Sequence, residues 1–105
     1  MTKKLLTEFK KQIKEVLAEN KNQCSICIQN IDTGLLAYTN LHGVKVSWDT
    51  IMVTLFVPGE ATFQIPFIYI KEFHKHTDEQ IEIFLEGRLL VSIRKIFKYG
   101  EKNGK

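Results

Sequence analysis

The sequence predicts a single α+β domain in which two amphipathic helices pack on a mainly antiparallel sheet. Three observations indicate this fold class. The N-terminal segment has apolar residues at helical spacing, several later segments alternate between apolar and polar residues, and one segment that begins with a proline fits a short helix. The chain has 105 residues, of which 44% are hydrophobic and 26% charged, enough for one core without disulfide support.

The first helix is predicted over residues 3–20, with Thr2 as its N-cap. Its apolar positions occupy about one third of the helix circumference. They are Leu5, Leu6, Phe9, Ile13, Val16 and Leu17. The opposite side carries Lys3, Lys4, Lys10, Lys11 and Lys14, while Glu8, Glu15 and Glu19 follow one flank. This separation of charges is compatible with a polyanion facing the lysines, or with a merely solvated helix face.

Strands are predicted for most of the remaining chain. The segment CSICIQNI (24–31) is followed by the turn DTG and a strand LLAYT (35–39), and NLHG (40–43) marks a break. Residues 44–57 are expected to form one long strand, whose apolar end (51–57) is covered on both faces. After the turn PGE comes a short strand, ATFQI (61–65). Two final strands, QIEIFLE (80–86) and LLVSIRKIF (89–97), flank Gly-Arg as a hairpin.

The segment that starts at Pro66 could form either a helix or a strand. As a strand, its apolar and polar residues do not separate, because Phe67 and Lys71 would share one face while Ile70 and Glu72 share the other. As a helix, Phe67, Ile70 and Phe73 share one side, and proline suits the first helical position. We therefore expect a helix from Pro66 to about His76, with Lys71 and Lys75 stacked away from the core.

Two cysteines, Cys24 and Cys27, have the C-x-x-C spacing in a segment that we expect to be a strand. Residues three apart on a strand point to opposite faces, so the thiols should diverge and pack as small hydrophobic groups. The alternative is a zinc site completed by His42, His74 or His76. The favoured interpretation assigns neither metal nor cofactor to the protein.

Charge and composition say little about binding partners. The net charge is +3, but the tail after Phe97 contributes three lysines against one glutamate. We expect a domain over residues 1–97 and a disordered polar tail over 98–105. No apolar stretch approaches the length of a membrane span, and the N-terminus lacks the apolar core of a secretory signal, which indicates a cytoplasmic protein.

Taken in order, the segments QIP, FIYIKEFHK, TDEQIEI and LEGRLLVSI resemble one domain of the bacterial DNA polymerase sliding clamp, the beta subunit. Upstream, TGLLAYTNLHGVKVSW is similar to the strand, break and strand of that family, with Asn40 where aspartate is usual, and LLTEFKKQIKEVL fits its first helix. The resemblance covers about residues 5–93. The family's strand before the first helix is missing, and its last strand is missing or replaced by KYGEKNGK.

The resemblance implies that helices face double-stranded DNA and contact phosphates without reading sequence, as in DNA replication. The implied DNA-binding residues are Lys3, Lys4, Lys10, Lys11, Lys14, Lys71 and Lys75. It also implies a homo-oligomer, because one domain offers only a small basic patch. The competing hypothesis is a protein-interaction module that keeps the fold, binds a protein partner at a sheet edge and has no DNA affinity. We expect no enzyme, since no nucleophile–base pair or carboxylate pair stands out.

Overall fold

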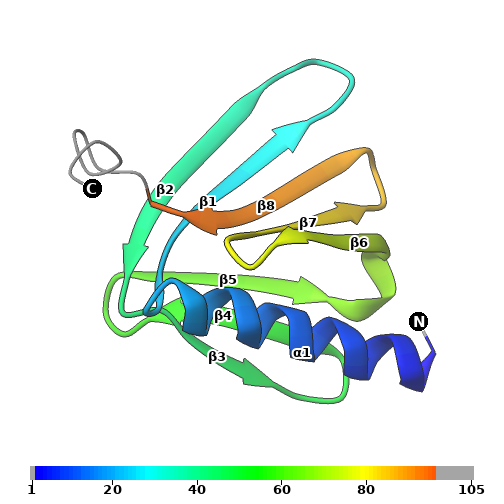
Figure 1. The fold of residues 1–105 in the computed structure, drawn as a ribbon. Coiled ribbons are helices and arrows are strands. Elements are labelled where there is room, and N and C mark those ends of the chain that lie inside the picture. The colour runs from blue at the N-terminus through cyan, green and yellow to red at the C-terminus, as the bar shows by residue number, and fades with distance from the viewer. Residues whose placement is uncertain (1, 97–105) are drawn as a thin grey trace.

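A computed structural model describes residues 2–96 and shows one α-helix and two antiparallel sheets in this part of the chain (Figure 1). The elements are α1 (Lys3–Glu19), β1 (Gln23–Asn30), β2 (Leu36–His42), β3 (Lys45–Trp48), β4 (Met52–Val57), β5 (Ala61–Pro66), the 3-10 turn η1 (Phe67–Tyr69), β6 (Ile70–Thr77), β7 (Gln80–Leu85) and β8 (Leu89–Lys95). One sheet has the order β2-β1-β8-β7-β6 and the other β3-β4-β5. The α+β class is confirmed. The predicted tail lies outside the described residues.

The helix α1 forms where the sequence predicts it. Thr2 caps its start, since the Leu5 N–H donates to Thr2 Oγ1 at 3.1 Å. The apolar stripe faces inward, and Phe9, Ile13, Val16 and Leu17 are buried. The helix ends at Asn20, whose side-chain amide donates to the Val16 carbonyl at 2.8 Å.

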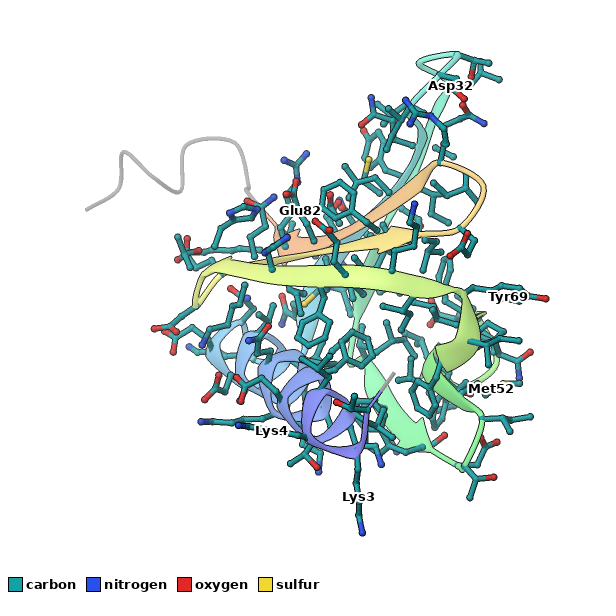
Figure 2. All side chains as sticks on the ribbon, turned by 90° about the vertical axis from the view of Figure 1, so that its right-hand side faces the viewer. Lys3, Lys4, Asp32, Met52, Tyr69 and Glu82 are labelled. Atoms are coloured by element: carbon teal, nitrogen blue, oxygen red, sulfur yellow. The ribbon has the colours of Figure 1, made fainter. Side chains whose placement is uncertain are left out.

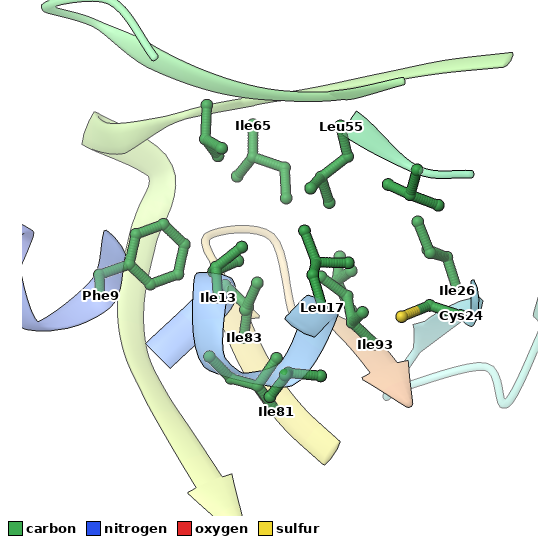
Figure 3. Packing of buried hydrophobic residues seen from close by; sticks show 14 of the residues in the cluster. Phe9, Ile13, Leu17, Cys24, Ile26, Leu55, Ile65, Ile81, Ile83 and Ile93 are labelled. Atoms are coloured by element: carbon green, nitrogen blue, oxygen red, sulfur yellow. The ribbon is translucent and has the colours of Figure 1, made fainter. Parts of the chain in front are cut away.

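The core lies where α1 and the two sheets meet (Figure 3). Isoleucines from β1, β7 and β8 form one wall, and Leu55 and Ile65 from the three-stranded sheet form another. Phe9 fills the space between them and is completely buried. Its ring centroid lies 5.0 Å from that of Phe73 and 6.4 Å from that of Trp48, so the helix joins both sheets.

The predicted second helix is wrong. Pro66 has φ −66° and ψ 134°, an extended conformation, and it pairs with Met52 at the end of β5. A single 3-10 turn, Phe67–Tyr69, follows, and the chain then runs on as β6. The Phe67 N–H donates to the Ile51 carbonyl at 2.8 Å, which fixes the turn against the start of β4.

Irregular pairing explains why the alternation test failed for β6. The register between β6 and β7 shifts between Ile70 and Glu72, and again between Lys75 and Thr77. A bulge changes which residues share a face, so Ile70 and Phe73 both turn inward although they are three residues apart. The spacing of the inward-facing residues therefore resembles the period of a helix.

The expected long strand over 44–57 is also wrong, because it is two strands joined by a tight turn. The Asp49 carboxylate accepts hydrogen bonds from the N–H groups of Ile51 and Met52, each at 2.8 Å. Such an aspartate turn reverses the chain, and β3 then pairs antiparallel with β4. β4 alternates between buried and half-buried residues, so it is not fully covered on both faces.

The remaining strands agree with the sequence analysis. β1 is the expected first strand, and β7 and β8 form the expected hairpin. The connection is one residue longer than the expected Gly-Arg turn, since Leu85 pairs with Leu89, and within it Gly87 and Arg88 both have positive φ, 81° and 62°. The predicted break at 40–43 begins only at Gly43, since β2 continues through Asn40 to His42.

Candidate nucleic-acid interface

We call the five basic residues of α1 the lysine face. Its members are Lys3, Lys4, Lys10, Lys11 and Lys14. Lys3, Lys4, Lys11 and Lys14 are exposed on the side of α1 away from the buried stripe, whereas Lys10 is half-buried at the border of that stripe. Figure 2 shows Lys3 and Lys4 projecting away from the sheets. From Lys3 to Lys14 the face extends about 16 Å along the helix, given a rise of 1.5 Å per residue.

No member of the lysine face forms a salt bridge within residues 2–96. The nearest helix acids are occupied by other groups. Glu8 accepts a hydrogen bond from Gln12 at 3.0 Å, and Glu15 is bound by Lys75. Neither Glu8 nor Glu15 therefore forms a salt bridge with a member of the lysine face.

The start of α1 adds to this positive potential. The amino end of a helix carries a partial positive charge, and acidic residues usually stabilise it. The first turn of α1 contains no acid, and two of its residues are Lys3 and Lys4. Positive charge at this end slightly destabilises the helix, and a bound anion would relieve it.

Lys10 has a second partner that connects the lysine face to the core. Its Nζ lies 5.5 Å from the centroid of the Trp48 ring on β3, within the range of a cation–π contact. Lys10, Lys11 and Lys14 also line a shallow depression together with Thr7, Glu15 and Ala18. Sequence reasoning missed Trp48 and Thr7, because nothing in the spacing shows that β3 passes beneath Lys10.

The two other predicted DNA-binding residues lie on β6 and not on a helix. Lys75 turns toward α1, where its Nζ lies 2.6 Å from Glu15 Oε1 and 3.3 Å from Asp78 Oδ1. The hydrogen bond to Glu15 is the main cause of a raised pKa for Lys75. Lys71 is exposed and lines a separate depression with Glu72, Glu86 and Arg88. Neither residue extends the lysine face.

The cysteines and histidines have mainly local partners. Cys24 is buried in the core, and burial raises its pKa to about 11, whereas Cys27 is half-buried. His74 contacts Glu72 at 2.9 Å and His76 contacts Glu82 at 2.5 Å. In the described part of the chain, no three His, Cys, Asp or Glu side chains come together as metal ligands.

Comparison with family models, curated proteins and solved structures finds no match to this chain. Within residues 2–96, no helix has the length and apolar character needed to cross a membrane.

Proposed function

We propose that this domain is a non-enzymatic DNA-associated protein whose lysine face contacts the phosphates of double-stranded DNA without reading its sequence. The observation that carries the proposal is the set of five lysines on one side of α1 with no salt bridge in the described residues. Flexible ammonium groups suit contacts that must tolerate any sequence, because they impose no fixed hydrogen-bond geometry.

The proposal retains only one part of the resemblance to a sliding-clamp domain, the helix that faces DNA. Only α1 presents a helix to DNA, and Lys75 acts by holding Glu15 rather than by touching phosphate. Five charges on one copy give modest affinity at physiological salt, so tight association requires several copies on the same duplex. A cytoplasmic role in DNA replication remains part of the proposal and rests on the sequence resemblance.

The test is a titration of a labelled duplex of mixed sequence at several salt concentrations. Each phosphate neutralised by lysine contributes about −0.9 to the slope of log affinity against log salt, so a fully engaged lysine face gives a slope of about −4.5. Replacing Lys11 and Lys14 by glutamine should reduce the steepness of the slope by about 2.

The matched control neutralises two basic residues away from α1. Lys45 on β3 and Arg94 on β8 are exposed, and neither contributes to the lysine face. Lys45→Gln with Arg94→Gln makes the same change in net charge and should leave the slope nearly unaltered. Absence of binding at low salt, or equal losses in the two double variants, would refute the proposal.

The second candidate is a protein-interaction module that binds a partner at a sheet edge and has no affinity for DNA. The observation in its favour is β2, an edge strand of which only Leu41 is buried. This candidate predicts that the duplex titration shows nothing at any salt concentration, while a change on β2 alters association with protein.

A further inference from the structure

The two edges of the five-stranded sheet differ in how open they are to further pairing. β6 carries Lys71, Glu72 and Lys75, and its pairing is irregular at both ends. Charges and bulges on an edge strand hinder the addition of another strand. β2 contains no Lys, Arg, Asp, Glu or Pro, and it pairs with β1 in an uninterrupted register over seven residues.

The hydrogen-bonding alternation of β2 shows which of its backbone groups point outward. The Asn30 N–H donates to the Leu35 carbonyl at 2.9 Å, in the same register as the β1–β2 ladder. In an antiparallel ladder, hydrogen-bonded pairs recur at every second residue. The odd-numbered residues of β2 therefore bond to β1, and the even-numbered residues from Leu36 to His42 direct their N–H and C=O groups away from the sheet.

We propose that β2 pairs antiparallel with β2 of a second copy of this chain, about a two-fold axis at Thr39. This register brings the outward backbone groups together, with Leu36 opposite His42 and Tyr38 opposite Asn40 of the other copy. The two Thr39 side chains then face each other in the pair without hydrogen bonds, where side chains are closest. The two sheets become one continuous sheet.

A second copy fits this edge on three grounds. The chain has a net charge of +3, so two copies approach each other best along a strand that carries no Lys, Arg, Asp or Glu. The open edge carries apolar side chains, since Leu36 is 61% and Tyr38 is 70% exposed. The β1–β2 hairpin also extends beyond α1 and the three-stranded sheet, so α1 does not obstruct the approach (Figure 1).

Pairing about a two-fold axis gives a closed assembly of two copies, because each copy uses its β2 edge once. A head-to-tail contact of β2 with β6 would instead build a ring or an open filament. The charges and bulges of β6 disfavour that contact. The inferred assembly is therefore a dimer, and it does not depend on DNA binding.

The test introduces a positive or a negative charge at Thr39, on the proposed two-fold axis. Thr39→Lys and Thr39→Glu each set two like charges face to face across the dimer, so each variant alone should sediment as a monomer where the wild type sediments as a dimer. An equimolar mixture of the two variants should restore a dimer. Thr62→Lys, at an exposed threonine on β5, is the matched control and should remain a dimer.

A proline variant tests the hydrogen bonds. Asn40 directs its N–H outward, so Asn40→Pro removes no bond to β1 but blocks pairing with a second copy. It should be monomeric with an unchanged circular dichroism spectrum. A monomeric wild type, a dimer that survives Thr39→Lys, or a mixture that stays monomeric would each overturn the proposal. Duplex titration of Asn40→Pro, which changes no charge, tests DNA binding separately.

Discussion

The ammonium group of Lys75 on β6 lies 2.6 Å from Oε1 of Glu15 on α1. This ion pair joins residues that are 60 positions apart and binds an acid on the flank of the helix that carries the lysine face. The Lys75 side chain is only 22% exposed, so its charge is directed at the helix rather than at solvent. The pair therefore offsets one negative charge on the flank of the lysine face.

Neutralising Glu15 should raise DNA affinity, and neutralising Lys75 should lower it. Two charges about 10 Å apart in water interact by roughly 0.4 kcal/mol, which corresponds to about a twofold change in affinity. Glu15→Gln removes a negative charge beside the lysine face, while Lys75 keeps its contact with Asp78, and it should raise duplex affinity about twofold. Lys75→Met leaves Glu15 unpaired and should lower it by a similar factor. A titration at low salt measures both, and shifts of the same sign would contradict the account.

Trp48 should report directly on occupation of the lysine face. It is the single tryptophan of the chain, and the Lys10 ammonium lies 5.5 Å from its ring centroid. A phosphate that draws Lys10 away changes the environment of the ring, so duplex addition should alter Trp48 emission. Lys10→Gln should remove most of this response while reducing affinity only moderately. An unchanged emission spectrum at saturating duplex would show that DNA does not engage Lys10.

Truncating Phe9 should strongly destabilise the fold. Phe9 is fully buried, and its ring contacts those of Trp48, Phe67 and Phe73. Replacing a buried phenylalanine by alanine costs about 3–5 kcal/mol, because it leaves a cavity among its neighbours. Urea denaturation measures the loss. Leu5→Ala on the same helix is the control and should cost much less, since Leu5 is 49% exposed.

The buried thiol of Cys24 should make stability fall at alkaline pH. Burial raises its pKa from 9.0 to about 11, so the unfolded chain loses the proton first as the pH rises. The free energy of unfolding should therefore decrease between about pH 9 and 11, by at most about 3 kcal/mol at 1.36 kcal/mol per pKa unit.

Two cysteine variants isolate this effect. Cys24→Ala should remove the extra alkaline slope in denaturation curves measured between pH 8 and pH 11. Cys27→Ser should keep the slope, because its thiol is not part of the core cluster. The same slope in Cys24→Ala and the wild type would show that another group is responsible.

Much of the fold was readable from local patterns. The stripe from Phe9 to Leu17 predicted α1, and the alternation around Gly-Arg predicted the β7–β8 hairpin, because helical spacing and turn residues are local properties. The prediction of a second helix failed for a reason that local sequence does not show. Pairing of β6 with β7 and a bulge after Ile70 reproduced an inward spacing that resembles a helix.

The turn at Asp49 was missed for a different reason. The apolar run from Ile51 to Val57 concealed it, and an aspartate followed by threonine was not recognised as a chain reversal. For the candidate site, sequence spacing located the lysines of α1. It did not show that Lys75 binds Glu15 or that Trp48 lies near Lys10, since both contacts depend on how distant strands pack against the helix.

The position of β1 between β2 and β8 has a consequence for biosynthesis. β1 comes before the other described strands in the chain, but its place between β2 and β8 requires β8, the last strand of the described residues. Until residues 89–95 emerge, one side of β1 has no neighbour, so this part of the nascent chain stays vulnerable to aggregation until β8 is available. Chaperone binding to stalled chains should therefore end abruptly once β8 has cleared the exit tunnel.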